Sequence, residues 1–380
     1  MPVNTREKMQ QSPAGSPRKI AFVFTAMPVG GAEDFALGAG SQLDADFEAH
    51  YICLREYGRL GEEAKHSGVP VHLVRVFASR WITPWAIRRF AAWLQKEKIA
   101  LVHSQTHHAH IFATKAAKLL GLPSVVHQQK TLAELPPRRA RIFCDCLARA
   151  SRIVALSRQT ARDLAEQFAI APEKIAVVAN GIDRRVFRAA EDRMALRREL
   201  GLPTAGLLVG SIGRLHRHKS HATTIEAVAM ARKQGLDLSA VLVGEGAERG
   251  ELESLARERG VTDAIVFAGP RRPVAPWIQS LDLFVLPSIW EGQPLAMLQA
   301  VACGIPLLAS DIEGNTAVLG RDHPGLFAPG DAGGLARLLA AASRDAGFLL
   351  QLCQSQERVD IPWSDQSARQ LSDLYRTLIP

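Results

Sequence analysis

Short apolar runs alternate with longer helical patterns along almost the whole chain. The runs are nearly continuous in apolar residues, which is typical of parallel strands that helices cover on both faces. This alternation over such a length predicts an α/β fold with two doubly wound, Rossmann-like domains. The candidate strands are KIAFVFT, HYICL, VHLVRV, ALVHS, SVVHQ, RIVALS and IAVVA, followed by LLVGSIG, AVLVGEG, IVFAG, LFVLPS and PLLAS.

The length of 380 residues exceeds what one hydrophobic core normally holds, which also favours two domains. We predict a disordered polar tail over 1–17, an N-terminal domain over 18–189 and a second domain over 190–363. A final helix within 364–380 could pack on either domain, including back on the N-terminal one. Because ligands bind beyond the carboxyl ends of parallel strands, two such sheets should face a central cleft that holds the active site.

Charge is unevenly distributed along the chain. Residues 1–189 hold 27 Lys and Arg against 16 Asp and Glu, a net of +11, whereas residues 190–380 hold 19 against 22, a net of −3. A basic half indicates an anionic partner, such as a phosphorylated acceptor or an anionic membrane, although a solvated arginine-rich surface gives the same count. Nucleic acid is disfavoured, because no basic-aromatic platform and no known reader motif appears.

The cysteine spacing and the hydropathy of the chain indicate the cellular compartment in which the protein is expected. The five cysteines have neither the spacing of a disulfide framework nor that of a zinc knuckle, so we expect reduced thiols in a cytoplasmic protein. No apolar run reaches 18 residues, so no membrane-spanning helix is expected. The segment IAFVFTAMPV at 20–29 resembles the apolar part of a signal peptide, but its composition and the Gly-Gly that follows favour a buried strand.

A Gly-Gly turn follows the first candidate strand. In TAMPVGGAED, Gly30 and Gly31 come where the strand ends and a helix opens. Backbone N–H groups at a helix start bind anions, and glycine lets a phosphate approach closely. The spacing is not G-x-G-x-x-G, so a nicotinamide or flavin fingerprint is not supported.

Two cations lie between a strand and a helix in the second half. In GSIGRLHRHKSH, Arg214 and Lys219 suit a diphosphate, the first as a planar fork and the second as a point charge. Both could equally be solvated loop residues. Histidines surround them, but no carboxylate or cysteine completes a metal-binding set, so they are interpreted as polar loop residues or minor helpers in anion binding: His216, His218 and His221.

Taken together, the motifs resemble those of the retaining glycosyltransferases of family 4, which have the two-domain GT-B fold. The motifs are VGGAE, NGID, GRLHRHK, VGEGAER, FAGPRR, VLPSIWEGQPLAMLQAVACGIPLLAS and EGN. The resemblance implies a metal-independent enzyme that moves a sugar from a nucleotide diphosphate donor, with a UDP-sugar as the favoured co-substrate and no resident cofactor. It further implies a glycan or glycolipid acceptor in lipopolysaccharide or exopolysaccharide assembly, with the protein cytoplasmic or peripheral on the inner membrane.

The resemblance also assigns roles to residues. Arg214 and Lys219 match the two cations that stabilise the leaving diphosphate, and Glu291 matches the first glutamate of the E-x7-E motif beside the donor sugar. With His127, these form the implied catalytic set. The implied donor-binding residues are Gly30, Gly31, Gly213, Arg214, Lys219, Gly269, Pro270, Glu291, Gly292, Gln293, Pro294, Leu295 and Gln299.

Two positions depart from the family pattern. Gln299 replaces the second glutamate of E-x7-E, which accepts hydrogen bonds from ribose, so the bond falls from about 1.5–3 kcal/mol to about 0.5–1.5 kcal/mol. The family histidine after GLP would fall on Gln129, whereas His127 lies two residues earlier on the same face of a strand. His127 could take its role or could simply be packed inside the domain. His103 resembles another cleft histidine of the family.

The basic N-terminal half offers candidate acceptor contacts. Arg138, Arg139 and Arg141 could, with His103, face a phosphorylated sugar or lipid headgroup. A helix after Pro84 should pack through Phe90, Ala91 and Leu94. Its aromatic and basic residues could lie at an anionic membrane surface, although they could also be ordinary exposed side chains: Arg80, Trp81, Trp85, Arg88 and Arg89.

Other functions stay open at this point. A catalytically silent nucleotide-sugar-binding protein would explain Gln299, although the retained Glu291, Arg214 and Lys219 argue against it. A nucleotide-sugar epimerase or a glycan phosphorylase could share the GT-B fold. The phosphorylase would require a lysine that holds pyridoxal phosphate.

Overall fold

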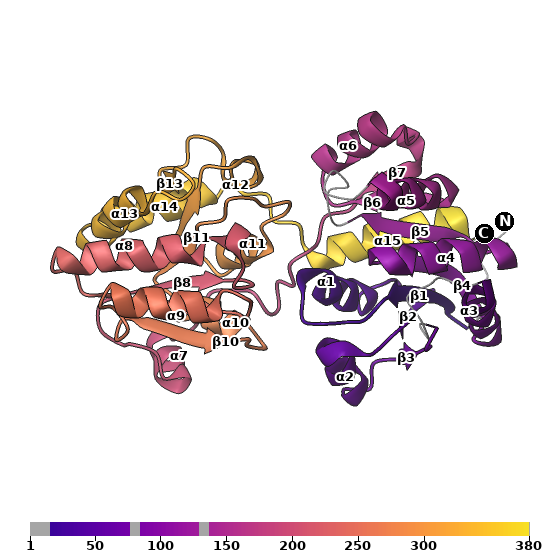
Figure 1. The fold of residues 1–380 in the computed structure, drawn as a ribbon, viewed down its shortest axis with the longest axis horizontal. Helices are drawn as coiled ribbons and strands as arrows, with labels where there is room; N and C mark the ends of the chain where they lie inside the picture. The colour runs from indigo at the N-terminus through magenta and orange to yellow at the C-terminus, as the bar shows by residue number, and fades with distance from the viewer. Residues whose placement is uncertain (1–15, 77–83, 129–136, 380) are drawn as a thin grey trace, which may run out of the picture. The chain divides into compact units, whose positions relative to one another are not determined.

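The computed structural model describes residues 16–76, 84–128 and 137–379, with only the backbone described for 137–141. Two compact units make up the chain: unit 1 comprises Met1–Gly181 and Ser364–Pro380, and unit 2 comprises Ile182–Trp363 (Figure 1). Most of the tail predicted over 1–17 lies outside the described residues. Among the helices of the described residues, none combines the length and apolarity needed to cross a membrane.

Unit 1 contains a seven-stranded parallel sheet with the order β3-β2-β1-β4-β5-β6-β7. Its strands lie where the apolar runs predicted them: β1 (Arg18–Phe24), β2 (Phe47–Cys53), β3 (Val71–Leu73), β4 (Ile99–Ser104), β5 (Ser124–Gln128), β6 (Arg152–Ala155) and β7 (Ile175–Val177). The order reverses between β1 and β4, which are adjacent in the sheet but separated by two strands in sequence.

Helices cover both faces of this sheet. They are α1 (Gly31–Gly40), α2 (Gly58–His66), α3 (Pro84–Lys96), α4 (His107–Leu120), α5 (Pro137–Arg149), α6 (Arg158–Phe168) and α15 (Ser364–Leu378), with a 3₁₀ turn at Pro172–Lys174. In α3 the predicted packed face is confirmed, since Phe90, Ala91 and Leu94 are buried. Their three- and four-residue spacing brings them to one side of the helix.

The C-terminal helix α15 completes unit 1 and is drawn in yellow among its indigo and purple elements (Figure 1). Leu371 and Tyr375 of α15 are fully buried in the core that contains Phe22 and Phe47. On the surface, Arg376 holds the carboxylates of Asp44 and Asp46. Apolar burial along one side and ion pairs at the edge thus fix the helix on this unit.

Unit 2 contains a six-stranded parallel sheet with the order β10-β9-β8-β11-β12-β13. The strands are β8 (Leu207–Ile212), β9 (Leu238–Val243), β10 (Ile265–Gly269), β11 (Leu283–Leu286), β12 (Leu307–Ser310) and β13 (Leu326–Phe327). The helices are α7 (Arg193–Leu200), α8 (His221–Lys233), α9 (Arg249–Glu258), α10 (Ala275–Gln279), α11 (Leu295–Ala302), α12 (Glu313–Leu319), α13 (Ala332–Arg344) and α14 (Ala346–Gln356), with a 3₁₀ turn at Arg217–Lys219.

The start of unit 2 lies at 181–182, whereas the sequence placed the join at 189–190. Ile182 donates its N–H to the carbonyl of Pro362 at 2.7 Å, which joins the two ends of the unit. Helix α7 is anchored by buried Arg197, whose guanidinium lies 2.6 Å from a carboxylate oxygen of Asp282. Helix α7 is therefore an integral part of unit 2.

A column of aromatic rings crosses the core of unit 1. Tyr51, Phe22, His103, His127 and Phe35 follow one another with centroid separations of 5.5, 5.2, 5.4 and 5.2 Å. Nδ1 of His103 lies 2.6 Å from the hydroxyl of Tyr375 on α15. Burial lowers the pKa of His127 to about 3 and lowers the pKa values of His103 and His110 well below the ordinary range. These histidines are therefore neutral in the folded protein.

We expect unit 1 to lose stability as the pH falls from 7.5 to 5.5. In the unfolded chain the three buried histidines take up protons near pH 6.5, whereas the folded protein keeps them neutral, so acid favours unfolding. Each histidine should contribute a slope of up to about 1.4 kcal/mol per pH unit. Urea denaturation across this range measures the slope.

The matched comparison uses His127→Leu and the exposed His66→Gln. His127→Leu should reduce the slope of unfolding free energy against pH by up to about 1.4 kcal/mol per pH unit, because one buried histidine is removed. His66→Gln should leave the slope unchanged because His66 is exposed. Identical slopes in His127→Leu and the wild type would contradict this origin of the acid sensitivity.

Candidate functional site

The predicted donor-binding residues of unit 2 gather at the carboxyl ends of its strands, where the strand order reverses. β8 and β11 are neighbours in the sheet, yet the chain passes through β9 and β10 between them. Arg214 and Lys219 follow β8, and Glu291 follows β11. Open α/β sheets bind ligands at such a switch point, because the loops on its two sides diverge and leave a crevice.

A buried ion pair joins the two sides of this switch point. Nζ of Lys219 lies 2.5 Å from Oε1 of Glu291, and the hydroxyl of Ser288 donates to the same oxygen at 2.6 Å. The side chains of Lys219 and Glu291 are only 17% and 7% exposed. The sequence predicted both residues in one site but not their pairing. The seryl hydroxyl was missed, and its only sequence signal is the position directly after an apolar run.

Three further contacts fix the loop that carries Glu291. Ile289 donates its N–H to the carbonyl of His218 at 2.8 Å, and the hydroxyl of Ser310 donates to the carbonyl of Ser288. A Cβ on Gly314 would lie 2.3 Å from the carbonyl oxygen of Glu291, so only glycine permits this approach. The glycine of the EGN motif therefore serves to let α12 pack against the loop.

The loop after β8 rests on a buried histidine. Nε2 of His221 lies 3.2 Å from the carbonyl of Arg214, and Nδ1 lies 3.1 Å from the hydroxyl of Ser211. Since a carbonyl only accepts, Nε2 carries the proton and Nδ1 accepts from the serine. Burial lowers the pKa of His221 to about 4, so the ring is neutral. The sequence grouped His221 with polar loop residues, but it is a buried support for the loop.

Arg214 itself is exposed, as are His216 and Arg217. The rings of His216 and His218 approach each other, with their Nδ1 atoms 2.7 Å apart. Across the described parts of the chain, no three His, Cys, Asp or Glu side chains gather in a way that could hold a metal ion. The exposed residues of this loop thus form a basic surface next to the Lys219–Glu291 pair.

The remaining donor-binding candidates occupy neighbouring turns of unit 2. Gly213 directly follows β8, and a Cβ on Gly244 would lie 1.8 Å from the carbonyl oxygen of Gly213, which explains a glycine in VGEG. Gly269 ends β10 with a φ of 71°, in the left-handed region that glycine adopts readily. Pro270 is exposed after it. The others surround the start of α11: Gly292, Gln293, Pro294, Leu295 and, one turn into the helix, half-buried Gln299.

In unit 1, the predicted Gly-Gly turn begins α1, with Gly30 as its N-cap. A Cβ on Gly30 would lie 2.5 Å from Oε2 of Glu33, so this carboxylate folds back over the start of the helix. Glu33 is only 7% exposed. A negative side chain favours a helix N-terminus, and here it lies where the sequence predicted a bound anion.

The predicted histidines of unit 1 are both inside the protein. His127 and His103 are fully buried in the ring column, and His103 contacts Tyr375 instead of the surface where an acceptor would bind. The distant helix α15 supplies this contact, so local sequence gave no sign of it. Backbone coordinates place the three candidate arginines, Arg138, Arg139 and Arg141, on α5. Gln129, Arg80 and Trp81 lie outside the described residues.

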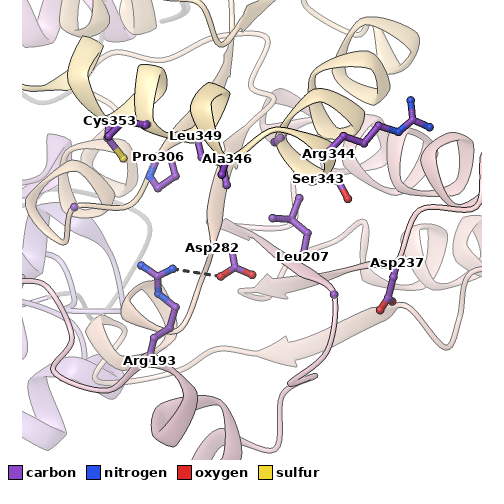
Figure 2. A pocket seen from close by; sticks show the side chains of 14 residues that line it. Arg193, Leu207, Asp237, Asp282, Pro306, Ser343, Arg344, Ala346, Leu349 and Cys353 are labelled. Atoms are coloured by element: carbon purple, nitrogen blue, oxygen red, sulfur yellow. Dashed lines mark hydrogen bonds and ion pairs between the residues drawn. The ribbon is translucent and has the colours of Figure 1, made fainter.

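A separate groove of about 850 Å³ opens at the amino-terminal edge of the sheet in unit 2. Figure 2 shows Arg193 and Asp282 inside it, joined by an ion pair of 3.3 Å. Leu207, at the start of β8, and Pro306, just before β12, lie on its wall. This groove is at the opposite end of the strands from Arg214, Lys219 and Glu291, so it is not the candidate site.

Comparison with known proteins gives matches for both units. A family model described as Glycosyltransferase Family 4 matches residues 29–186, and one described as Glycosyl transferases group 1 matches residues 206–345. The chain is 30% identical to the putative glycosyltransferase EpsF of Bacillus subtilis, over 55% of this chain and 57% of the relative. It is 29% identical to the D-inositol 3-phosphate glycosyltransferase of Rhodococcus erythropolis, over 94% of this chain and 79% of the relative.

A third relative is the UDP-Gal:alpha-D-GlcNAc-diphosphoundecaprenol alpha-1,3-galactosyltransferase of Escherichia coli, 28% identical over 62% of this chain and 63% of the relative. The chain thus spans less than two thirds of the length of several curated relatives that it matches. Among solved structures, Anabaena Alr3699/HepE in complex with UDP and glucose aligns with a TM-score of 0.82 at 20% identity, covering 95% of this chain and 100% of that one. The likeness shows a shared GT-B fold.

We expect the Lys219–Glu291 pair to be strongly coupled in stability. Glu291→Gln leaves a mostly buried ammonium without its counter-charge, which should destabilise the protein by up to about 3 kcal/mol, and Lys219→Met should act similarly. The double variant should lose much less than the sum, because neither charge is then left alone. Urea denaturation of the four proteins measures the coupling.

The more exposed pair of Arg232 and Asp263, 2.8 Å apart with side chains 31% and 69% exposed, is the matched control. Its cycle of Arg232→Met and Asp263→Asn should give a coupling below about 1 kcal/mol, because solvent screens exposed charges. Additive losses at Lys219 and Glu291 would mean that the pair does not hold the two loops together.

Proposed function

The chain belongs to the glycosyltransferases of family 4, with the GT-B fold, and from this premise we propose that it is a metal-independent, retaining glycosyltransferase. It moves a sugar from a nucleotide diphosphate donor to a glycan or glycolipid acceptor. The observation that carries the proposal is the buried Lys219–Glu291 pair beside exposed Arg214 at the switch point of unit 2.

The proposed reaction uses the cations of the loop after β8. As the bond between the anomeric carbon and the diphosphate breaks, negative charge grows on the phosphate oxygens, and Arg214 and Lys219 stabilise it. An ammonium has three donor hydrogens, so Lys219 can contact a phosphate while it keeps Glu291. Because the pair already fixes the ammonium, little reorganisation is required when the donor arrives.

The donor is held by groups on both sides of the cations. Glu291 and the backbone N–H groups of Gly292 and Gln293 bind the sugar, and the turn at Gly269–Pro270 lies against the base. The neutral carboxamide of Gln299 forms hydrogen bonds with the ribose hydroxyls. UDP is the favoured nucleotide, which is supported by the complexes of Anabaena Alr3699/HepE with UDP and with UDP-glucose.

Unit 1 would bind the anionic group of the acceptor. The three arginines of α5 attract a phosphorylated group, and Gly30 and Gly31 bring backbone amides to the reacting oxygen. His127 packs edge-on against Phe35 of α1, so it supports the glycine turn through this helix instead of touching substrate. The E. coli relative is named for a lipid-linked diphosphate acceptor, which supports a similar anionic glycolipid in polysaccharide or lipopolysaccharide assembly.

A catalytically silent nucleotide-sugar-binding protein is the second candidate, favoured by Gln299 alone. Thermal shifts with UDP, GDP, ADP and their glucose conjugates identify the donor, because binding to the folded form raises the melting temperature. The accepted donor is then incubated without acceptor, and nucleotide release is measured for the wild type, Glu291→Gln and the exposed control Glu258→Gln.

An enzyme should release nucleotide about a hundredfold more slowly after Glu291→Gln, since the sugar loses a group that positions it, while Glu258→Gln matches the wild type. Equal background rates in all three proteins, with donor binding intact, would favour the silent protein. No thermal shift with any nucleotide would contradict both candidates.

We also propose peripheral contact with an anionic membrane through α3. Trp85 is 59% exposed, its ring lies under the guanidinium of Arg89 at 5.4 Å, and Arg88 is exposed beside them. An exposed aromatic ring among arginines is typical of helices that rest on anionic headgroups.

Sedimentation with vesicles tests this contact. Wild-type protein should bind vesicles that contain anionic phosphatidylglycerol at low salt and should dissociate as salt rises, because screening weakens the attraction. Trp85→Ser with Arg88→Gln and Arg89→Gln should bind about tenfold more weakly, whereas Lys233→Gln on α8 should not differ. Equal binding to neutral phosphatidylcholine vesicles would rule out recognition of the anionic surface.

A further inference from the structure

Two large apolar side chains are exposed directly before Glu291. Ile289 is 51% exposed and Trp290 is 48% exposed, on the loop between β11 and α11. Single exposed apolar residues are ordinary on a protein surface. Two in succession on a loop that also carries a candidate site residue are not, because they keep apolar area in water where the loop could have carried polar side chains.

The backbone beneath these side chains is fixed. Ile289 is held by its N–H bond to His218, Ser288 by the hydroxyl of Ser310, and Glu291 by the approach of Gly314. The six-membered part of the indole of Trp290 lies beside Gly292, where a Cβ would be 3.4 Å from Cη2. The exposure therefore does not come from a slack loop. A rigid backbone presents an aromatic ring and an aliphatic chain to solvent.

Neighbouring side chains of this loop differ in polarity and in exposure to solvent. The carboxylate of Glu291 is almost fully buried and is directed to Lys219, whereas the indole beside it is half-exposed. The turn at Gly269–Pro270, which the proposed function assigns to the base, follows β10, two strands from β8 on one side. Trp290 follows β11, which is next to β8 on the other side. Trp290 is thus at the sugar end of the donor and away from the base.

We propose that Ile289 and Trp290 form one wall of a subsite for a pyranose ring of the acceptor. This inference rests on the proposed function and adds a recognition element for its second substrate. A pyranose has a face of C–H groups that stacks on an aromatic ring and a rim of hydroxyls that needs polar partners. Polar groups for this rim lie on the neighbouring loop, because the carbonyl of His218 accepts the N–H of Ile289 and the exposed ring of His216 lies against that of His218. A rigid indole provides this contact with little loss of conformational entropy.

Saturation-transfer NMR with simple glycosides tests the subsite. The probes are methyl α-D-glucopyranoside, methyl α-D-galactopyranoside and methyl α-D-mannopyranoside, each added to full-length protein with saturating UDP. Wild-type protein should transfer saturation to the C–H face of at least one of them. Trp290→Ala should reduce that transfer at least about fivefold, while Trp290→Phe should keep most of it because an aromatic face remains. Leu350→Ala, which removes another exposed apolar side chain of unit 2, should match the wild type.

The thermal shift with UDP separates this inference from the proposed function. A normal UDP shift in Trp290→Ala with lost glycoside contact supports the subsite. A normal UDP shift with unchanged glycoside contact, or with no contact to any probe in the wild type, overturns the subsite and leaves the proposed function standing. A UDP shift lost only in Trp290→Ala would place the indole on the donor and would also overturn the subsite. Absence of any UDP shift in the wild type would overturn the UDP donor itself.

Discussion

The pairing of one buried ammonium with one buried carboxylate organises the candidate site. Lys219 and Glu291 come from loops on opposite sides of a strand reversal, 72 positions apart in sequence, and their charges oblige the two loops to stay together. A buried charge without its partner is costly, so each side chain holds the other in place. Because the backbone around Glu291 is fixed by Gly314 and by the carbonyl of His218, the pair sets the geometry of the residues next to it: Arg214, Ile289 and Trp290.

Unit 1 depends on a different kind of contact. A column of aromatic rings in contact with one another passes through its central strands, and the hydroxyl of Tyr375 meets the column at His103. Protonation of His103 or His127 would place a charge inside this buried column, so packing and protonation are linked in this core. The two units therefore use charge in opposite ways: unit 2 buries a matched pair, whereas unit 1 excludes charge from a polar-looking set of side chains.

The features that the sequence predicted are those with a local pattern, whereas the contacts described above join residues far apart in the chain. Apolar runs predicted β1 to β12 because buried parallel strands leave a continuous signal, whereas β13 spans two residues and leaves none. The glycine turns and the Arg214–Lys219 loop were placed by their position between a strand and a helix. The burial of His103 and the partner of Glu291 were not predicted, because each depends on a residue far along the chain. Such pairings leave no local pattern in residue type or spacing.

The chain leaves unit 1 at Gly181 and returns to it at Ser364, so the core around Phe22 and Phe47 is closed by residues that the ribosome makes after the whole of unit 2. Unit 2 is made in one uninterrupted stretch and can fold while its neighbour still lacks a helix. During synthesis, an apolar face of unit 1 therefore stays uncovered until α15 has been made. A nascent chain of this design has its greatest need of chaperone protection in unit 1 and keeps that need until α15 has emerged.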